Sequence, residues 1–304
     1  MDISIICPLY NAEKYIKGLH KNLRDQLLDE DDRLDIIYAL TESNDNTENF
    51  LKENKIKYKK IKKEDFSHSY TRESMAYEYG KDIIVFISQD IYPKNDMWLK
   101  NLISSIKSGE AEASFSRQIC KYNNIEKYTR EFNYQDESRI SSKDKIKELG
   151  LYTFFYSDAS SAVKGEVYKN LKAYDGKKLL INEDMYFAEK LISNGFRIKY
   201  CADSEIYHSH DFKLVDLYKR YFDTGVFFAT NQKFSNYSGN GNGISMVKYI
   251  LKRSIEDKNI KVLFRVLPDF AARFIGSTLG KKYSKLSEKI ILKSTLNKAY
   301  WLEV

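Results

Sequence analysis

Short apolar runs alternate with amphipathic segments along the first third of the chain. Continuous runs, as expected for strands that are buried on both faces, occupy residues 3–7, 34–40 and 82–87. A more exposed strand is predicted at 57–62, and a helix is predicted to begin at Asn11 as its N-cap. Further helices are predicted at residues 46–54, 69–80 and 97–108. This alternation predicts an α/β fold with a mainly parallel sheet and helices on both faces.

The pattern becomes less regular after residue 120. The charged and polar stretch 121–150 predicts helical pieces or a mobile flap. The apolar run in "YTFFYSDASSAV" predicts a strand that ends at Asp158. An amphipathic helix is predicted at 183–194, and Gly195 follows it in the position where helices commonly stop.

Two short strands are predicted next, at 197–200 and 205–208, and the second ends in the tetrad "HSHD". From Phe212 onward the chain reads as helices, with a glycine-rich break at 238–243. In a parallel sheet, ligands bind outside the carboxyl ends of the strands. That rule draws attention to three loops, at residues 8–11, 41–47 and 88–92.

Asp90 is a lone carboxylate directly after a buried strand. By itself it is also what an ordinary loop would contain. His208 and His210 are separated by one residue, so in a strand their side chains would point to the same face; they would otherwise be ordinary polar residues at a strand end. A hard divalent cation such as Mg²⁺ or Mn²⁺ prefers oxygen ligands with an occasional imidazole, and leaves positions for substrate phosphates. Asp90 and His208, together with a diphosphate, would make such a site.

Three further residues have two interpretations each. Glu183 and Asp184 could simply complement the dipole of a helix N-terminus, or one of them could be a general base aimed into a cleft. Arg72 could be a solvated helix residue, or its guanidinium could reach the phosphates of a nucleotide. Spacing alone does not decide between these readings.

The ordered set of motifs resembles a known family. "ISIICPLYNAEKYI" resembles the opening of family 2 glycosyltransferases with the GT-A fold, and "FSHSYTRESMAYEYGKDIIVFISQDIYPKNDMWL" is similar to their rhamnosyltransferase branch. The resemblance continues in order through "SRQICKY", "FFYSDASSAV", "NEDMYFAEKLISNGFRIKY", "YHSHDF" and "YKRYFDTGVFF". It implies a GT-A catalytic domain at residues 1–211, divided into a nucleotide-binding half (1–120) and an acceptor-binding half (121–211). Residues 212–304 would form a basic, mostly helical region.

The resemblance also implies an activity and roles for particular residues. The activity would be transfer of rhamnose or a related hexose from a dTDP- or UDP-sugar, with inversion, to a hydroxyl of a glycan or polyprenyl-linked saccharide in bacterial polysaccharide synthesis. By motif, Asp184 stands at the catalytic base, and Asp90 and His208 stand at a Mg²⁺ or Mn²⁺ site. Asp158 and Glu183 would lie on the acceptor side. The nucleotide-sugar would contact Pro8, Tyr10, Glu42, Arg72, Gln89 and Asp90.

The chain departs from the family pattern at two places. The base-reading loop, "LTESNDNT", has Leu40 and Thr41 where acidic residues would align, so Glu42 is the candidate substitute. The segment "HSYTRE" has Ser69 and Glu73 where the branch tends to have glycine and asparagine. Both departures bear on which donor is bound.

Charge is concentrated in the C-terminal fifth of the chain. Residues 244–304 contain 13 Lys or Arg and 5 Asp or Glu, a net charge of +8, whereas the whole chain carries +7. This asymmetry predicts an anionic neighbour. The amphipathic, basic segments "MVKYILKRSI" and "LSEKIILKSTL" predict contact with an anionic membrane surface, with packing on the catalytic domain or between subunits of a homo-oligomer as the alternative.

Other features narrow the class of protein. The three cysteines are far apart and show no metal-binding spacing, and the start of the chain has no signal-peptide pattern, so we expect a cytoplasmic protein, peripheral at the inner face of the membrane. No nucleic-acid-reading motif accompanies the basic tail, and no nucleic-acid partner is expected. A nucleotidyltransferase would have a glycine-rich phosphate loop after the first strand, and the first glycine here is Gly18. A catalytically weak or inactive member of the family that serves as a partner subunit remains an alternative, as does a nucleic-acid-binding protein that uses the basic tail.

Overall fold

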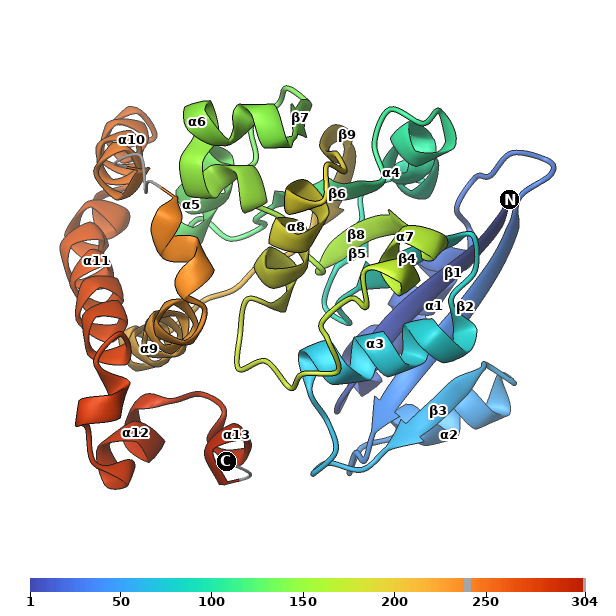
Figure 1. The fold of residues 1–304 in the computed structure, drawn as a ribbon, viewed down its shortest axis with the longest axis horizontal. Coiled ribbons are helices and arrows are strands. Elements are labelled where there is room, and N and C mark those ends of the chain that lie inside the picture. The colour runs from blue at the N-terminus through green and yellow to red at the C-terminus, as the bar shows by residue number, and fades with distance from the viewer. Residues whose placement is uncertain (238–241, 303–304) are drawn as a thin grey trace.

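The computed structural model describes residues 1–237 and 242–302. A twisted mixed sheet lies at the centre with helices on both faces, and a layer of helices from the last third of the chain packs at one end (Figure 1). Within the described residues the sheet has nine strands in the order β3-β2-β1-β4-β8-β6-β9-β5, with β7 paired to β9. They span Asp2–Leu9 (β1), Arg33–Thr41 (β2), Tyr58–Ile61 (β3), Ile83–Ile87 (β4), Tyr92–Pro93 (β5), Ala113–Ile119 (β6), Arg139–Ser141 (β7), Ser160–Lys164 (β8) and Ile198–Tyr207 (β9).

The first four strands form the parallel part of the sheet. β1 pairs in parallel with β2 and β4, and β2 pairs with β3. β8 then runs antiparallel between β4 and β6, while β6 and β9 are parallel to each other. This confirms the α/β class with a mixed, mainly parallel sheet, and it brings the carboxyl ends of β1, β2 and β4 to one edge.

Helices cover both faces of the sheet. They are α1 (Glu13–Arg24), α2 (Thr47–Glu53), α3 (His68–Tyr79), α4 (Trp98–Lys107), α5 (Ile125–Asn133), α6 (Ile146–Leu149), α7 (Gly165–Asn170) and α8 (Glu183–Ser193). Successive residues of a strand face opposite sides. Accordingly Ile5 of β1 packs in one buried cluster with residues of α1 and α4, whereas its neighbour Ile6 packs in another with residues of α3 and α8.

Three details of the predicted elements are wrong. Asn11 does not cap α1: it has a left-handed backbone (φ 47°), and Ala12 occupies the N-cap position. The free N–H groups of Ala12 and Glu13 instead donate to Thr47 Oγ1 and Asp45 Oδ2, both at 2.9 Å. The loop after β2 therefore supplies the cap, which local sequence does not reveal.

The run before Asp158 is also not a strand. Gly150–Phe154 forms a 3-10 helix, and the strand β8 begins only after Asp158. The aromatic residues favour a strand locally, but Phe154 is fully buried against Phe234 and Tyr237, so tertiary packing overrides strand propensity. The acid thus precedes its strand instead of ending it.

The two short strands predicted at 197–200 and 205–208 are one strand, β9. Its pairing with β6 jumps from Ser116↔Cys201 to Arg117↔Glu205, so residues 202–204 form an irregular bulge. Ser204 is fully buried there and donates to the carbonyl oxygen of Trp98. The bulge thus lets the polar residue Ser204 lie inside the sheet, and β9 continues through the gap between the two predicted strands.

The last third of the described chain contains helices, as expected: α9 (Leu214–Thr230), α10 (Asn242–Glu256), α11 (Ile260–Gly280), α12 (Glu288–Ser294) and α13 (Lys298–Leu302). Most of the predicted glycine-rich break lies outside the described residues, and Asn242 and Gly243 begin α10. Figure 1 shows α11 at the outer edge with α9 beside it. No helix in the described ranges has the length and apolar character needed to cross a bilayer.

Glycines allow α9 and α11 to pack backbone against backbone. A Cβ added at Gly276 would lie 2.3 Å from the carbonyl oxygen of Tyr218, and one at Gly280 would lie 2.0 Å from that of Phe222. Gly225 of α9 is equally tight against the carbonyl oxygen of Ser277, at 2.3 Å. This contact fixes the outer helix to the rest of the molecule.

Replacing Gly280 by alanine should destabilise the protein by about 1–3 kcal/mol, the usual cost of overpacking a tight contact. Gly18→Ala is the matched control, because a Cβ at Gly18 in α1 meets nothing within 4 Å and alanine is the better helix former by about 1 kcal/mol. Urea unfolding followed by circular dichroism measures both. Equal stability of the Gly280→Ala and Gly18→Ala proteins would contradict the packing described here.

Candidate active site

The loops after β1 and β4 are joined at the carboxyl edge of the sheet. The backbone N–H of Tyr10 donates to Gln89 Oε1 at 2.8 Å, and Gln89 Nε2 donates to the carbonyl oxygen of Tyr10 at 3.0 Å. This two-point contact holds the segment that leads to Asp90 against the segment that follows β1. Gln89, predicted to contact the nucleotide-sugar, thus has a structural partner at this edge.

Asp90 lies beside two histidines. His208 follows β9 and its backbone N–H donates to the carbonyl oxygen of Ile119, which continues the pairing of β9 with β6. Its Nε2 is 3.6 Å from Asp90 Oδ1, and the rings of His208 and His210 meet edge to face with centroids 4.5 Å apart. One ligand atom from each of Asp90, His208 and His210 lies within 4.8 Å of the others. The predicted meeting of Asp90 and His208 is observed, and His210 joins them.

The hydrogen bonds of Gln118 determine which nitrogen of His208 carries the proton. Arg130 Nη1 donates to Gln118 Oε1, and because arginine can only donate, that oxygen must face it. The same Oε1 is 2.8 Å from His208 Nδ1, so Nδ1 must be the protonated nitrogen. In the neutral ring the Nε2 lone pair then points toward Asp90 Oδ1. Two acceptors facing each other at this distance repel unless a cation lies between them.

The protonation states fit a cation at this place. Burial raises the pKa of Asp90, but in acid, where the histidines are protonated, a hydrogen bond from His208 and the charges of both rings outweigh it and bring the pKa to about 2. Burial lowers the pKa of His208, and burial together with His208 lowers the pKa of His210 to about 3. At neutral pH the cluster therefore presents one carboxylate and two neutral imidazoles, a donor set that suits a divalent ion.

A second cluster of charges surrounds Arg72, whose side chain is 4% exposed. Arg72 Nη1 forms an ion pair with Glu183 Oε1 at 2.9 Å, and Nη2 is 3.5 Å from the carbonyl oxygen of Asp158. Its Nε–H has no partner among the described residues. Arg72 was expected to contact nucleotide phosphates; in the structure it joins α3 to the start of α8, and the nucleotide contact stays a prediction.

Asp184 follows Glu183 at the first turn of α8. Its Oδ1 accepts a hydrogen bond from the backbone N–H of Met185, and Asn182 before the helix adopts a left-handed conformation (φ 58°) that turns the chain into α8. Burial, with the nearby charges of Glu183 and Asp158, raises the pKa of Asp184 to about 8. Burial raises the pKa of Glu183 too, but His68 and Arg72 outweigh it and the net shift is downward. The pKa of Asp184 is thus raised while that of the adjacent Glu183 is lowered, as in sites where one of two acids is a base.

Asp158 is 2% exposed and has partners for both carboxylate oxygens. Oδ1 accepts from Ser161 Oγ at 2.8 Å, and Oδ2 accepts from the hydroxyl of Tyr174 at 2.6 Å. Burial raises its pKa. In this structure it anchors the loop that contains Tyr174; its predicted contact with an acceptor stays a prediction.

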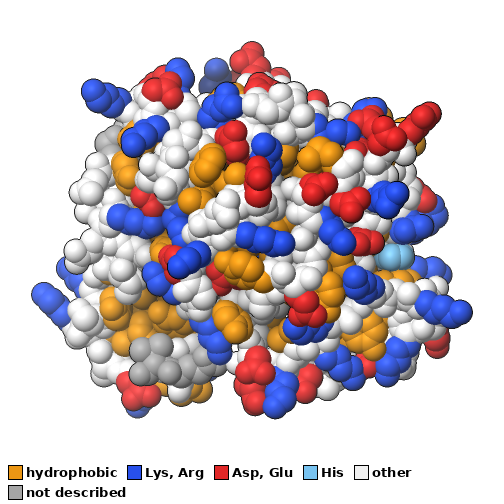
Figure 2. All heavy atoms as spheres, turned by 45° about the vertical axis from the view of Figure 1, so that its right-hand side comes forward, with side chains coloured by type: hydrophobic (Ala, Val, Ile, Leu, Met, Phe, Trp, Pro, Cys, Tyr) orange, Lys and Arg blue, Asp and Glu red, His pale blue; other side chains and the backbone are white. Residues whose placement is uncertain are grey.

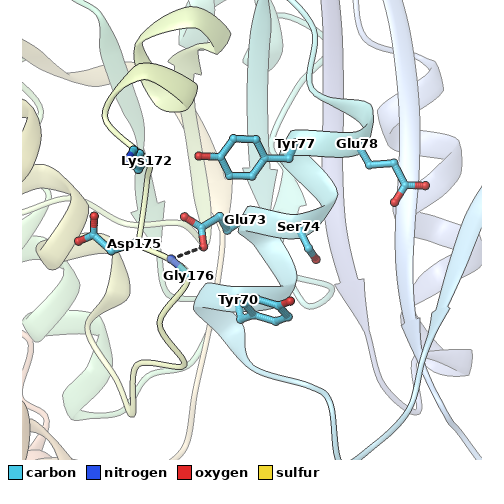
Figure 3. A pocket seen from close by; sticks show the side chains of 8 residues that line it. All are labelled: Tyr70, Glu73, Ser74, Tyr77, Glu78, Lys172, Asp175 and Gly176. Atoms are coloured by element: carbon cyan, nitrogen blue, oxygen red, sulfur yellow. Dashed lines mark hydrogen bonds between the residues drawn. The ribbon is translucent and has the colours of Figure 1, made fainter.

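Ser69 and Glu73, which depart from the family pattern, hold the loop that contains Tyr174. Glu73 of α3 accepts the backbone N–H groups of Tyr174 and Gly176, and Figure 3 shows the second of these bonds. Ser69 Oγ donates to the carbonyl oxygen of Lys177 and accepts the N–H of Leu179. The loop needs such support because positive φ angles occur at Lys172, Ala173, Asp175 and Gly176. It also borders an open depression of about 890 Å³ beside α3.

The remaining residues expected around the nucleotide lie near the ends of β1 and β2. Pro8 is buried inside β1, which extends to Leu9 and so is longer than predicted. Tyr10 is 40% exposed, with the Lys63 amine 5.4 Å from its ring centroid. Glu42 is exposed, and its Oε2 accepts the backbone N–H of Lys63 at 3.3 Å. The nucleotide contacts of these three residues stay predictions.

Contacts connect the two clusters without interruption. His208 contacts Gln118, whose Nε2 donates to Ser157 Oγ at 2.8 Å. Ser157 precedes Asp158, and the carbonyl of Asp158 faces Arg72, the partner of Glu183. Sequence reasoning did not identify Gln118 or Arg130, because a glutamine inside a strand and an arginine in a helix carry no signal by themselves.

Gln118→Leu should weaken Mn²⁺ binding by about 10- to 100-fold, the usual effect of removing the group that orients a ligating histidine. Isothermal titration of Mn²⁺ in the presence of a nucleoside diphosphate measures this without requiring turnover. Gln26→Leu is a matched control, since Gln26 is similarly buried and lies next to α1. Unchanged Mn²⁺ affinity in Gln118→Leu would contradict the orienting role.

Known proteins place this architecture in a family. Residues 4–172 match the model of the family described as Glycosyl transferase family 2. The O-antigen chain rhamnosyltransferase RfbN of Salmonella typhimurium is 29% identical over 307 aligned residues, covering 99% of this chain and 96% of that protein. The O-antigen chain rhamnosyltransferase WbaN of Salmonella anatum is 31% identical, covering 79% and 78%.

Solved structures of similar fold are more distant in sequence. The mannosyltransferase PcManGT from Pyrobaculum calidifontis, in complex with GDP-Man and Mn²⁺, superposes with a TM-score of 0.64 at 12% identity, covering 93% of this chain and 88% of that one. TarS 1-349 from S. aureus, in complex with UDP-GlcNAc, gives 0.54 at 16% identity, covering 94% and 92%. These likenesses support the GT-A fold, and the family match extends over more than half of the chain. The chain therefore belongs to glycosyl transferase family 2.

Proposed function

We propose that this protein is an inverting, metal-dependent hexosyltransferase that moves rhamnose or a related sugar from a dTDP- or UDP-sugar to a hydroxyl of a lipid-linked saccharide. The similarity to two O-antigen chain rhamnosyltransferases supports this sugar and this pathway class. The observation that carries the proposal is the pair of connected clusters, Asp90 with two neutral histidines on one side and Asp184 with a raised pKa on the other.

The first cluster would hold Mg²⁺ or Mn²⁺ through Asp90 and His208, with His210 as a third donor. Bound there, the ion would supply positive charge to the leaving nucleoside diphosphate. Asp90 Oδ1 and His208 Nε2 are 3.6 Å apart, close enough for a single ion to be held by both. By resemblance, Ser88 stands where the family's Asp-x-Asp metal motif has its first acid and Asp90 where it has its last, and His210 offers a donor that compensates. This argues against an inactive partner subunit.

The second cluster would move the proton. Asp184 accepts the proton of the acceptor hydroxyl as that oxygen attacks the anomeric carbon from the side opposite the diphosphate, which inverts the configuration. Burial and the neighbouring acids raise the pKa of Asp184 to about 8, near neutral pH, so the fraction that is ionised there is a stronger base than a solvated carboxylate. The Arg72–Glu183 ion pair holds the start of α8, and so positions Asp184.

A nucleic-acid partner is not part of the proposal. On the face drawn in Figure 2, lysines and arginines are interspersed with acidic side chains, and the coloured residues there form no continuous basic track. We also propose that the catalytic domain ends at residue 211. A lipid-linked saccharide would be held at the membrane, so we propose that the protein is cytoplasmic and peripheral at the inner face of that membrane.

A donor screen tests the proposed reaction. Release of dTDP or UDP from a panel of nucleotide-sugars, with a lipid-linked saccharide as acceptor, should require Mg²⁺ or Mn²⁺ and should favour one hexose donor. Asp90→Ala should remove most of the metal-dependent release. Turnover that is undiminished by a chelator and by Asp90→Ala would contradict the proposal.

Asp184→Asn should lower kcat by about 10²- to 10⁴-fold, as expected for removal of a positioned base. The same change should stabilise the fold by about 1 kcal/mol or more at pH 8, because one pKa unit corresponds to about 1.4 kcal/mol. The wild-type carboxyl has a raised pKa in the folded state, so ionisation disfavours folding: the penalty is absent below about pH 4 and grows up to about pH 8. Thermal unfolding across this range measures the difference.

Asp211→Asn is the control for that comparison, since Asp211 is an exposed acid near the other cluster. It should leave the pH dependence of stability unchanged. If Asp184→Asn kept near-full turnover, the base assignment would be wrong; if it destabilised the fold at pH 8, the raised pKa would be wrong.

A further inference from the structure

Helix α11 exposes a stripe of large apolar side chains. They recur at the spacing of one helix face, and two of them are 80% exposed: the stripe consists of Ile260, Phe264, Leu267, Phe274 and Ile275. Pro268 and Ala271, between them in sequence, are also exposed. Exposed apolar patches of this kind usually mark a surface that binds something.

The opposite face of α11 already has its partners. Val262 and Val266 are buried with Ile250 of α10 and with residues of α5, and Gly276 and Gly280 lie against α9. The stripe is therefore not the face that packs α11 onto the molecule. The outer position of α11 in Figure 1 agrees with this.

The charges around the stripe are mainly positive. Glu256 and Asp257, just before α11, are exposed, but they pair with Arg253 and Lys127. The single acid of α11, Asp269, is 2% exposed and pairs with Arg273 at 2.6 Å. Exposed lysines stand at both ends of the helix, at Lys258 and Lys261 before and within its first turn, and at Lys281, Lys282 and Lys285 after it. An apolar stripe with cations at its ends is the pattern of a helix that lies in a lipid headgroup layer.

We propose that α11 lies flat in the surface of an anionic bilayer, with its stripe among the upper acyl chains and its terminal lysines at the headgroups. At 21 residues the helix is about 30 Å long. The sequence predicted that the segment "MVKYILKRSI" of α10 contacts the membrane, and we propose α11 in its place. In α10, Ile250 is fully buried and Met246 and Val247 pack against the same cluster, so much of the apolar side of this helix faces inward.

A second copy of the chain is the less suitable occupant. Two α11 helices packed antiparallel on their stripes would bring the lysines at one end of each helix against those at the other end of its mate. The outward face of α11 has no acid to pair with them, because Asp269 is buried. Anionic lipid headgroups would neutralise the same lysines.

The inner side of α11, opposite the stripe, also lies close to the cluster of Asp90, His208 and His210. A cavity of about 240 Å³ is lined by Lys261, Val262 and Arg265 of α11 on one side and by His210 on the other. A lipid-linked saccharide held at the bilayer would thus arrive next to the residues proposed to bind the donor. In this respect the inference rests on the proposed function and deepens it, because it identifies α11 as the element that contacts the membrane in which the lipid-linked acceptor is held.

Co-sedimentation of the full chain with vesicles tests the inference. Binding to vesicles of phosphatidylglycerol and phosphatidylcholine should exceed binding to phosphatidylcholine alone, and it should decrease as salt is raised. The double substitution Phe264→Glu and Leu267→Glu should reduce binding at least about tenfold, because two side chains lose their apolar burial. Leu27→Glu, which changes a 50%-exposed leucine of the loop after α1, is the matched control and should bind like wild type.

A second measurement does not depend on a charged substitution. The emission of Phe264→Trp, after subtraction of the wild-type signal of Trp98 and Trp301, should shift to the blue on anionic vesicles and be quenched by brominated lipids. Asp184→Asn should bind vesicles normally, so failure of the catalytic proposal leaves this result intact. Undiminished binding of the double variant, no quenching of Phe264→Trp, or a wild-type dimer in lipid-free buffer that the double substitution dissociates would each overturn the inference.

Discussion

The buried ion pair between Arg72 and Glu183 is the interaction on which the site depends. It joins α3, which follows the exposed edge strand, to the start of α8, which carries Asp184. Removing one partner of a buried pair typically costs about 3–5 kcal/mol, because the other charge is left without compensation. Here the loss would also free the segment whose left-handed Asn182 aims Asp184, so stability and chemistry depend on the same contact.

The two principal acids of the site, Asp90 and Asp184, have different surroundings, and these suit them to different roles. Asp90 is half-buried beside neutral imidazoles and remains ionised over the physiological range, which suits a cation ligand. Asp184 lies among other acids, and their charges and its burial outweigh the effect of Arg72 and raise its pKa to about 8, which suits a proton acceptor. Gln118 and Ser157 connect the two groups, and Arg130 fixes the orientation of Gln118. The hydrogen bonds of Gln118 therefore set the tautomer of His208 and also link it, through Ser157 and the adjacent Asp158, to Arg72 and Glu183.

Continuous apolar runs were sufficient to predict the parallel half of the sheet, because strands covered on both faces leave that signature. Motif resemblance correctly brought Asp90 and His208 together. Local patterns failed where tertiary contacts replace local ones: Thr47 and Asp45 cap α1 in place of Asn11, and a bulge carries β9 through Ser204. The structural roles of Glu73 and Ser69 could not be predicted, because their partners are backbone groups of a distant loop.

We propose that Asp90, His208 and His210 bind a divalent cation that faces the donor diphosphate, with Asp184 across the site. A crystal structure with Mn²⁺ and a nucleotide-sugar, phased for the anomalous signal of manganese, tests it most directly. We expect one anomalous peak within about 2.3 Å of a carboxylate oxygen of Asp90 and a ring nitrogen of His208, with Asp184 facing the anomeric carbon. A manganese peak elsewhere, or a donor bound away from these residues, would contradict it.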